Sequence, residues 1–119
     1  MGEEPVAPLR EPPVRGVETI GDAVVVRLAG ELDLYNADDV RTALTGALAA
    51  APSRVVVDLS AVEFVDSTAL GVLIEARSKL GPNGLVLAEP QLETRRALQV
   101  SGLDRHLPVH DSVEAALEG

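Results

Sequence analysis

The stretch that decides the fold is Val55–Leu80, VVVDLSAVEFVDSTALGVLIEARSKL. Its first residues, Val55–Leu59, are mostly β-branched and apolar, which is typical of a buried strand. Ser60–Asp66 is predicted to be a connection, and a helix is predicted to begin at Ser67. The dipeptide Gly81-Pro82 ends this helix, because glycine favours the C-terminal cap and proline cannot continue the helix.

The predicted helix carries a stripe of mainly apolar side chains at helical spacing, which indicates that one side of the helix packs against the core. Val72 and Ile74 widen the stripe over the first two turns, so we expect the start of the helix to be well buried. The stripe consists of Ala69, Leu70, Leu73, Ala76, Arg77 and Leu80.

Three polar residues, Asp66, Ser67 and Thr68, stand at the start of this helix. The first backbone amides of a helix have no partner within the helix and lie at the positive end of its dipole. Asp66 or Ser67 can cap these amides, and capping is the ordinary role of both residue types at such a position. The alternative is that the Ser67 hydroxyl faces solvent and is phosphorylated. Thr68 is a second candidate, although a first-turn threonine more often caps or packs.

The N-terminal part of the domain reads as a hairpin of antiparallel strands. Arg15–Ile20 and Ala23–Ala29 are predicted strands, and Gly21-Asp22 is a two-residue hairpin signal. The next residues, Gly30–Asp33, are expected to leave the sheet, with Glu31 and Asp33 as carboxylates in a loop.

Strands and helices then alternate, which favours an α/β layer of parallel strands joined by right-handed helical connections. A helix capped by Asn36 is predicted first, with a buried face made of Val40, Leu44, Ala47, Leu48 and Ala51. A strand over Leu85–Ala88, a helix over Gln91–Val100 and an edge strand over Leu107–Val109 follow. The last helix begins at Asp111, which forms a capping-box pair with Glu114, and Val113, Ala116 and Leu117 are expected to dock it.

The length of 119 residues corresponds to one domain. Residues 1–14 are acidic and proline-rich, and we predict a flexible tail there, with the folded domain over residues 15–119. The N-terminus has no apolar core that would make it a signal peptide, and no apolar run approaches the roughly 20 residues of a membrane span. We therefore expect a cytoplasmic protein.

The charge balance limits the kinds of partner. The chain has 19 acidic and 10 basic residues, a net charge of −9, and only 2% aromatic residues. Such a chain repels the phosphates of nucleic acids and of anionic membranes, so we predict no direct binding to either. If the protein controls transcription, it does so through another protein.

No arrangement of residues in the sequence suggests catalysis or metal binding. There is no cysteine. His106 and His110 have helical spacing, but Pro108 lies between them and disfavours a helix. Ser67 lacks the sequence context of an activated nucleophile, and no loop fits the phosphate-binding pattern. We predict no enzymatic activity, no metal and no cofactor.

The residues Asp66–Gly71, which follow the strand that ends at Val57-Asp58-Leu59, resemble the signature of the STAS domain. Gly30–Asp33 resembles a second motif of that family. The likeness is greatest to the single-domain anti-sigma factor antagonists and extends from about Val17 nearly to the C-terminus. Glycine is more usual at the position of Ala69, and alanine should tighten the start of the helix.

The resemblance implies a STAS fold, with a four- to five-stranded, mostly parallel sheet and helices mainly on one face. In this family the serine after the aspartate, here Ser67, is phosphorylated by a partner that is both serine kinase and anti-sigma factor, and a PP2C-type phosphatase removes the phosphate. The resemblance further implies a protein that is a monomer when free and has a partner-binding surface made of Glu31, Asp33, Asp66, Ser67, Thr68 and Leu70. The alternative is a STAS scaffold subunit of a stress-signalling or lipid-transport complex.

Overall fold

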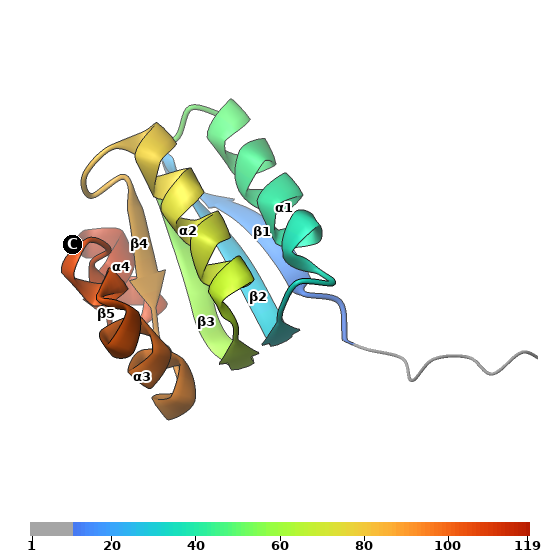
Figure 1. Cartoon of the computed structure of the whole chain (residues 1–119). Coiled ribbons are helices and arrows are strands. Elements are labelled where there is room, and N and C mark those ends of the chain that lie inside the picture. The colour runs from blue at the N-terminus through green and yellow to red at the C-terminus, as the bar shows by residue number, and fades with distance from the viewer. Residues whose placement is uncertain (1–10) are drawn as a thin grey trace, which may run out of the picture.

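A computed structural model describes residues 11–119 (Figure 1). Five strands form one mixed sheet in the order β1-β2-β3-β4-β5, with β1 antiparallel to β2 and all other neighbours parallel. The predicted sheet with an antiparallel N-terminal hairpin is therefore confirmed. The strands are β1 (Val14–Ile20), β2 (Ala23–Leu32), β3 (Arg54–Val65), β4 (Leu85–Ala88) and β5 (Val109–His110).

Most of the helices cover one face of the sheet, as predicted. In Figure 1, α1 and α2 lie side by side in front of the sheet, and α4 lies behind β4. The helices are α1 (Ala37–Ala49), α2 (Ser67–Leu80), α3 (Leu92–Ser101), the single 3-10 turn η1 (Leu103–Arg105) and α4 (Val113–Glu118). Most of the predicted tail, residues 1–10, lies outside the described residues. β1 begins at Val14, one residue earlier than expected.

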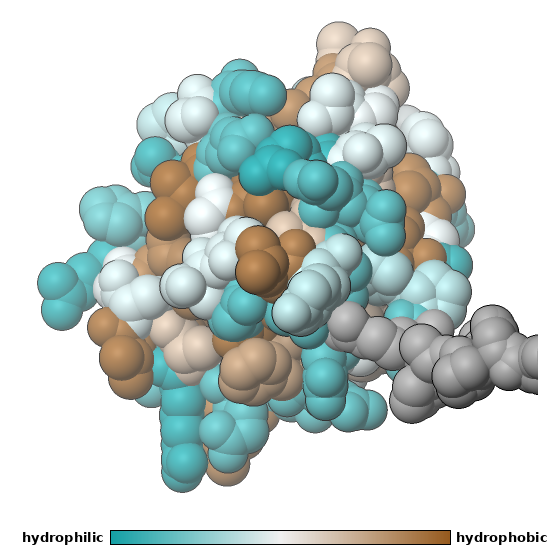
Figure 2. Space-filling view, turned by 45° about the vertical axis from the view of Figure 1, so that its right-hand side comes forward, coloured by the Kyte–Doolittle hydropathy of each residue, from teal (hydrophilic) through white to brown (hydrophobic). Residues whose placement is uncertain are grey.

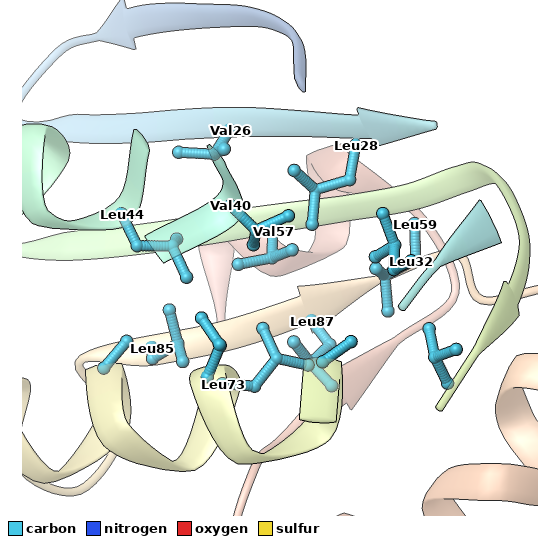
Figure 3. Packing of buried hydrophobic residues seen from close by; sticks show 14 of the residues in the cluster. Val26, Leu28, Leu32, Val40, Leu44, Val57, Leu59, Leu73, Leu85 and Leu87 are labelled. Carbon is cyan, nitrogen blue, oxygen red and sulfur yellow. The ribbon is translucent and has the colours of Figure 1, made fainter. Parts of the chain in front are cut away.

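The main hydrophobic core lies between the sheet and helices α1, α2 and α3 (Figure 3). Alternate residues of the central strands point into it, because successive side chains of a strand face opposite sides of the sheet. The largest fully buried side chains are leucines, and burying each one stabilises the fold by about 1.5–3 kcal/mol. Among the core residues labelled in Figure 3 are Val26, Leu28, Val40, Leu44, Val57, Leu59, Leu73, Leu85 and Leu87.

The opposite face of the sheet has a smaller core, which α4 covers. Val25, Val56, Val86 and Ala88 pack there with Ala116, Val113 and Leu117, so the predicted docking of the last helix is confirmed. The predicted cap of this helix is wrong by one residue. Ser112, not Asp111, is the N-cap, and its hydroxyl accepts a hydrogen bond from the Ala115 amide at 3.0 Å.

β2 and β3 are both longer than predicted. Gly30–Leu32 does not leave the sheet, and Ser60–Val65 is not a connection; the two segments continue the parallel pairing through two shifts in register. Burial explains the extension, because Leu32, Val62 and Val65 all point into the main core. The extended strands bring the residues after Leu32 and after Val65 to the same edge of the sheet.

Smaller differences from prediction concern single side chains and element ends. Ile74 is 48% exposed and does not widen the buried stripe of α2. Ala51 is exposed, because α1 ends at Ala49. The edge strand β5 is Val109–His110, two residues only.

The surface is mixed rather than uniformly polar. Figure 2 shows apolar residues reaching the surface at separate points among polar ones, which is ordinary for a globular domain. Across residues 11–119, every helix is too short or too polar to cross a membrane.

Candidate functional site

The site begins where β3 passes into α2. Asp66 has an extended backbone and is the N-cap of α2: its Oδ1 accepts a hydrogen bond from the Ala69 amide at 3.0 Å. The Asp66 amide also donates to the Leu32 carbonyl at 3.0 Å, which ties the start of α2 to the end of β2. Of the two predicted cap candidates, Asp66 is therefore the cap and Ser67 is not.

Ser67 is the first residue of α2 and is exposed. Because Asp66 already binds the Ala69 amide, the Ser67 hydroxyl is not needed to cap the helix. Within residues 11–119 it makes no hydrogen bond. A hydroxyl that is exposed, unbonded and next to the free amides of a helix N-terminus is suited to accept and retain a phosphoryl group.

The same carboxylate fixes the loop between β2 and α1. Asp66 Oδ2 accepts a hydrogen bond from the Leu34 amide at 3.1 Å, although the two residues are far apart in the sequence. Asp33 Oδ1 accepts from the Tyr35 amide at 3.0 Å, which closes a local turn. The one side chain of Asp66 therefore joins the start of α2 to this loop.

Asn36 completes the loop from the other side. It occupies the predicted N-cap position of α1, but its side chain makes no cap bond. Instead, Asn36 Oδ1 accepts from the Asp33 amide at 2.9 Å, and Asn36 Nδ2 donates to the Glu31 carbonyl at 2.8 Å. Asn36 is only 9% exposed, so the loop has a buried polar residue that holds it from inside.

The structure brings most of the sequence-predicted site residues to one edge. Asp33 is half-buried in the loop held by Asp66, and Thr68 is half-buried in the first turn of α2. Glu31 is exposed near the end of β2, opposite Phe64 of β3. Leu70 is also half-buried and packs against the main core.

Three large exposed side chains at this edge were not predicted. Tyr35 is 85% exposed, Leu34 is 65% exposed and Phe64 is 52% exposed. Leu34 and Tyr35 lie in the loop bound to Asp66, and Phe64 lies two residues before Asp66. Their only signal in the sequence is that bulky apolar residues stand among the acidic residues of the two motifs.

The edge is acidic, and His106 lies away from it. A shallow hollow of about 220 Å³ is lined by Glu11, Gly30, Glu31 and Glu63. His106 is remote from Ser67: its carbonyl accepts from Arg77 Nε at 2.7 Å, and Arg77 is ten residues along α2, roughly 15 Å from Ser67. Over the described part of the chain, no three metal-ligating side chains come together. The arrangement can present a hydroxyl to another protein's active site.

Known proteins share this fold and these motifs. The family model of the STAS domain matches residues 15–116. The anti-sigma-F factor antagonist RsfB of Mycobacterium tuberculosis is 34% identical over 97 residues, covering 80% of this chain and 79% of that protein. The crystal structure of an anti-sigma factor antagonist from Mycobacterium paratuberculosis is 33% identical, with a TM-score of 0.83, covering 92% of this chain and 97% of that one.

A third relative is the Bacillus cell fate determinant SpoIIAA, whose structure in the phosphorylated form is 25% identical, with a TM-score of 0.65, covering 87% of this chain and 96% of that one. As its two motifs predicted, the chain belongs to the STAS domain family and, within it, to the anti-sigma factor antagonists.

Proposed function

We propose that this protein is an anti-sigma factor antagonist controlled by phosphorylation of Ser67. In its unphosphorylated form it binds an anti-sigma factor and so frees a sigma factor for transcription. The anti-sigma factor is also the serine kinase that phosphorylates Ser67 and ends the complex, and a PP2C-type phosphatase restores the binding form. The observation that carries this proposal is the exposed Ser67 hydroxyl, which the Asp66 cap leaves unbonded at the start of α2.

Charge accounts for the switch without a change of fold. Phosphorylation adds about −1.5 to −2 charges at pH 7. The N-terminus of α2 tolerates that charge within the free protein. A partner surface that fits a small neutral hydroxyl beside the Asp66 carboxylate instead meets a larger, strongly hydrated anion, and stripping its hydration costs free energy. A penalty of about 2.7 kcal/mol is enough to weaken binding about a hundredfold.

Several further properties belong to the same proposal. The protein acts by binding and has no catalytic activity of its own, since the Ser67 hydroxyl is a substrate for the partner's kinase. It contacts no nucleic acid, in keeping with its net charge of −9. It works in the cytoplasm, where the sigma factor meets RNA polymerase, and it is a monomer when free.

The test is a paired pull-down from lysate of the source cells, with Ser67→Ala and Ser67→Glu as baits and mass spectrometry of the captured proteins. We expect the alanine bait to capture the anti-sigma factor kinase and the glutamate bait to lose it. Titration of the purified kinase should give affinities that differ by about a hundredfold. Equal capture and equal affinity would reject the switch and favour a scaffold role. Elution of the protein as a large homo-assembly in gel filtration would support that role.

A further inference from the structure

We propose that Leu34 and Tyr35 form an apolar anchor for the anti-sigma factor, and that Asp66 is the positioning residue that holds this anchor beside Ser67. The inference rests on the proposed function, because it concerns the same partner. It adds the contacts that supply affinity, whereas Ser67 supplies the control.

The anchor consists of two adjacent side chains that the fold holds out in solvent. Tyr35 is 85% exposed and Leu34 is 65% exposed, so folding leaves much of their apolar surface in water. Exposing apolar surface to water costs free energy, and that free energy is recovered when a partner covers the surface. Tyrosine is also among the residues that most often dominate binding energy at protein interfaces, because its ring is large and rigid.

The loop is fixed before any partner arrives. The Leu34 amide is bound by Asp66 Oδ2, the Tyr35 amide by Asp33 Oδ1 and the Asp33 amide by Asn36 Oδ1. Three successive backbone amides are therefore held by side chains rather than by water. Binding through such a loop loses little conformational entropy, because the order already exists in the free protein.

Asp66 couples the anchor to the phosphorylation site. Its Oδ1 caps α2 at the Ala69 amide, and its Oδ2 holds the Leu34 amide. One carboxylate therefore sets the position of Ser67 and of the anchor together. The partner must fit both features at once, with an apolar recess for Leu34 and Tyr35 next to the active site that receives Ser67. The surrounding carboxylates, Glu31 and Glu63 among them, favour a basic rim around that recess.

The first experiment measures the affinity of the purified anti-sigma factor of the source organism for surface variants. All variants carry Ser67→Ala, so that phosphorylation does not interfere. Leu34→Ser and Tyr35→Ser should each weaken binding about tenfold or more. The controls are Leu92→Ser and Val100→Ser on α3, which remove side chains of similar exposure, 62% and 90%. They should bind within about twofold of the parent.

The control at Leu92 lies away from the anchor, and the control at Val100 lies eight residues further along α3. Gln91, next to Leu92, donates through Nε2 to the Ser60 carbonyl at 2.8 Å. Ser60 precedes Asp66 by six residues of extended strand, which is roughly 20 Å. A loss of affinity that is equal in the anchor variants and the controls would overturn the proposal, as would no loss in the anchor variants.

The second experiment tests the positioning role of Asp66 in the free protein, with Asp66→Asn. Asparagine is as good an N-cap as aspartate, so the Ala69 amide stays protected. Its side chain has only one acceptor oxygen, so the Leu34 amide loses its partner. Amide hydrogen exchange should become about tenfold faster at Leu34 and stay unchanged at Ala69. Unchanged exchange at Leu34 would show that Asp66 does not hold the loop.

The two proposals fail in different ways. If Ser67→Ala and Ser67→Glu bind the anti-sigma factor equally, the switch is wrong. If those two variants differ as expected but Leu34→Ser and Tyr35→Ser bind like the controls, the switch stands and the anchor is wrong.

Discussion

At the start of α2 the Asp66 carboxylate accepts a hydrogen bond from the Ala69 amide, and at the start of α4 the Ser112 hydroxyl accepts one from the Ala115 amide. Both bonds are 3.0 Å long and join residues three apart. The two helices therefore begin in the same way, with different residues in the capping role. At α4 the Ser112 hydroxyl itself makes the capping hydrogen bond. At α2 the aspartate makes it, and the next residue, Ser67, stays exposed and unbonded. The difference shows that the residue that takes the cap decides whether a serine hydroxyl at the helix start stays unbonded.

The largest effect expected from this comparison is on phosphoryl transfer. With the anti-sigma factor kinase and ATP, Ser67→Ala should lose phosphorylation completely, because the accepting hydroxyl is gone. Ser112→Ala should be phosphorylated like the parent, since the Ser112 hydroxyl is engaged by the Ala115 amide and is not the acceptor. Intact-protein mass spectrometry checks both. Phosphate on the Ser67→Ala variant would show that the wrong hydroxyl has been identified, with Thr68 the nearest alternative.

The second effect is on stability at α2. Asp66→Ala removes both hydrogen bonds of the carboxylate, so the free energy of unfolding should fall by about 2 kcal/mol: about 1 from the lost cap and about 1 from the Leu34 amide. Urea unfolding followed by far-ultraviolet circular dichroism measures this change. Asp66→Asn is the matched control and should lose about half as much, since it keeps the cap. Equal losses would place the whole effect on something other than the cap.

The third effect is the corresponding loss at α4. Ser112→Ala removes a cap that holds one amide, and stability should fall by about 1 kcal/mol in the same urea assay. Ser112→Asp restores a cap of similar strength and should be close to the parent. If Ser112→Ala had no effect, the two helix starts would differ in more than the identity of the capping residue.

The smallest effect is expected for Ser67→Ala, which should change stability by less than about 0.5 kcal/mol. The side chain is exposed and carries no cap bond, and alanine is a good helix former. The comparison with Ser112→Ala is the sharpest internal check, because the same substitution is made at two helix starts. A loss near 1 kcal/mol at Ser67 would mean that its hydroxyl shares the cap.

The fold could be predicted largely from the sequence, because apolar runs mark the strands and helical spacing of apolar residues marks the helices. The short apolar runs of β2, β3 and β4 and the Gly81-Pro82 stop after α2 mark elements that the structure confirms. The strand ends could not be predicted in the same way. Gly30 and Ser60 are residue types that favour turns, whereas the burial of Leu32 and Val65 against distant residues favours continued pairing of both segments in the sheet.

The parts of the site made by neighbouring residues could be predicted from the sequence. The parts that depend on contacts between residues far apart in the sequence could not. The order Asp66-Ser67 at a helix start predicted a cap and a candidate hydroxyl but left open which residue is the cap, and the structure assigns the cap to Asp66. The hydrogen bond from Leu34 to Asp66 joins residues 32 positions apart, so no local pattern indicates it. Capping residues are also ambiguous in sequence: Asn36 stands at an N-cap position but uses its side chain inside the loop. The exposure of Leu34 and Tyr35 has no periodic signature.

The fluorescence of Tyr35 can report on binding without an added label. The chain contains one tyrosine and no tryptophan, so its tyrosine emission comes from that one side chain. Because Tyr35 is 85% exposed, its emission should be sensitive to quenchers in solution until a partner covers the ring. If the anchor is correct, association with the anti-sigma factor can be followed by quencher protection in the unlabelled protein. Release after phosphorylation can be timed by the same signal.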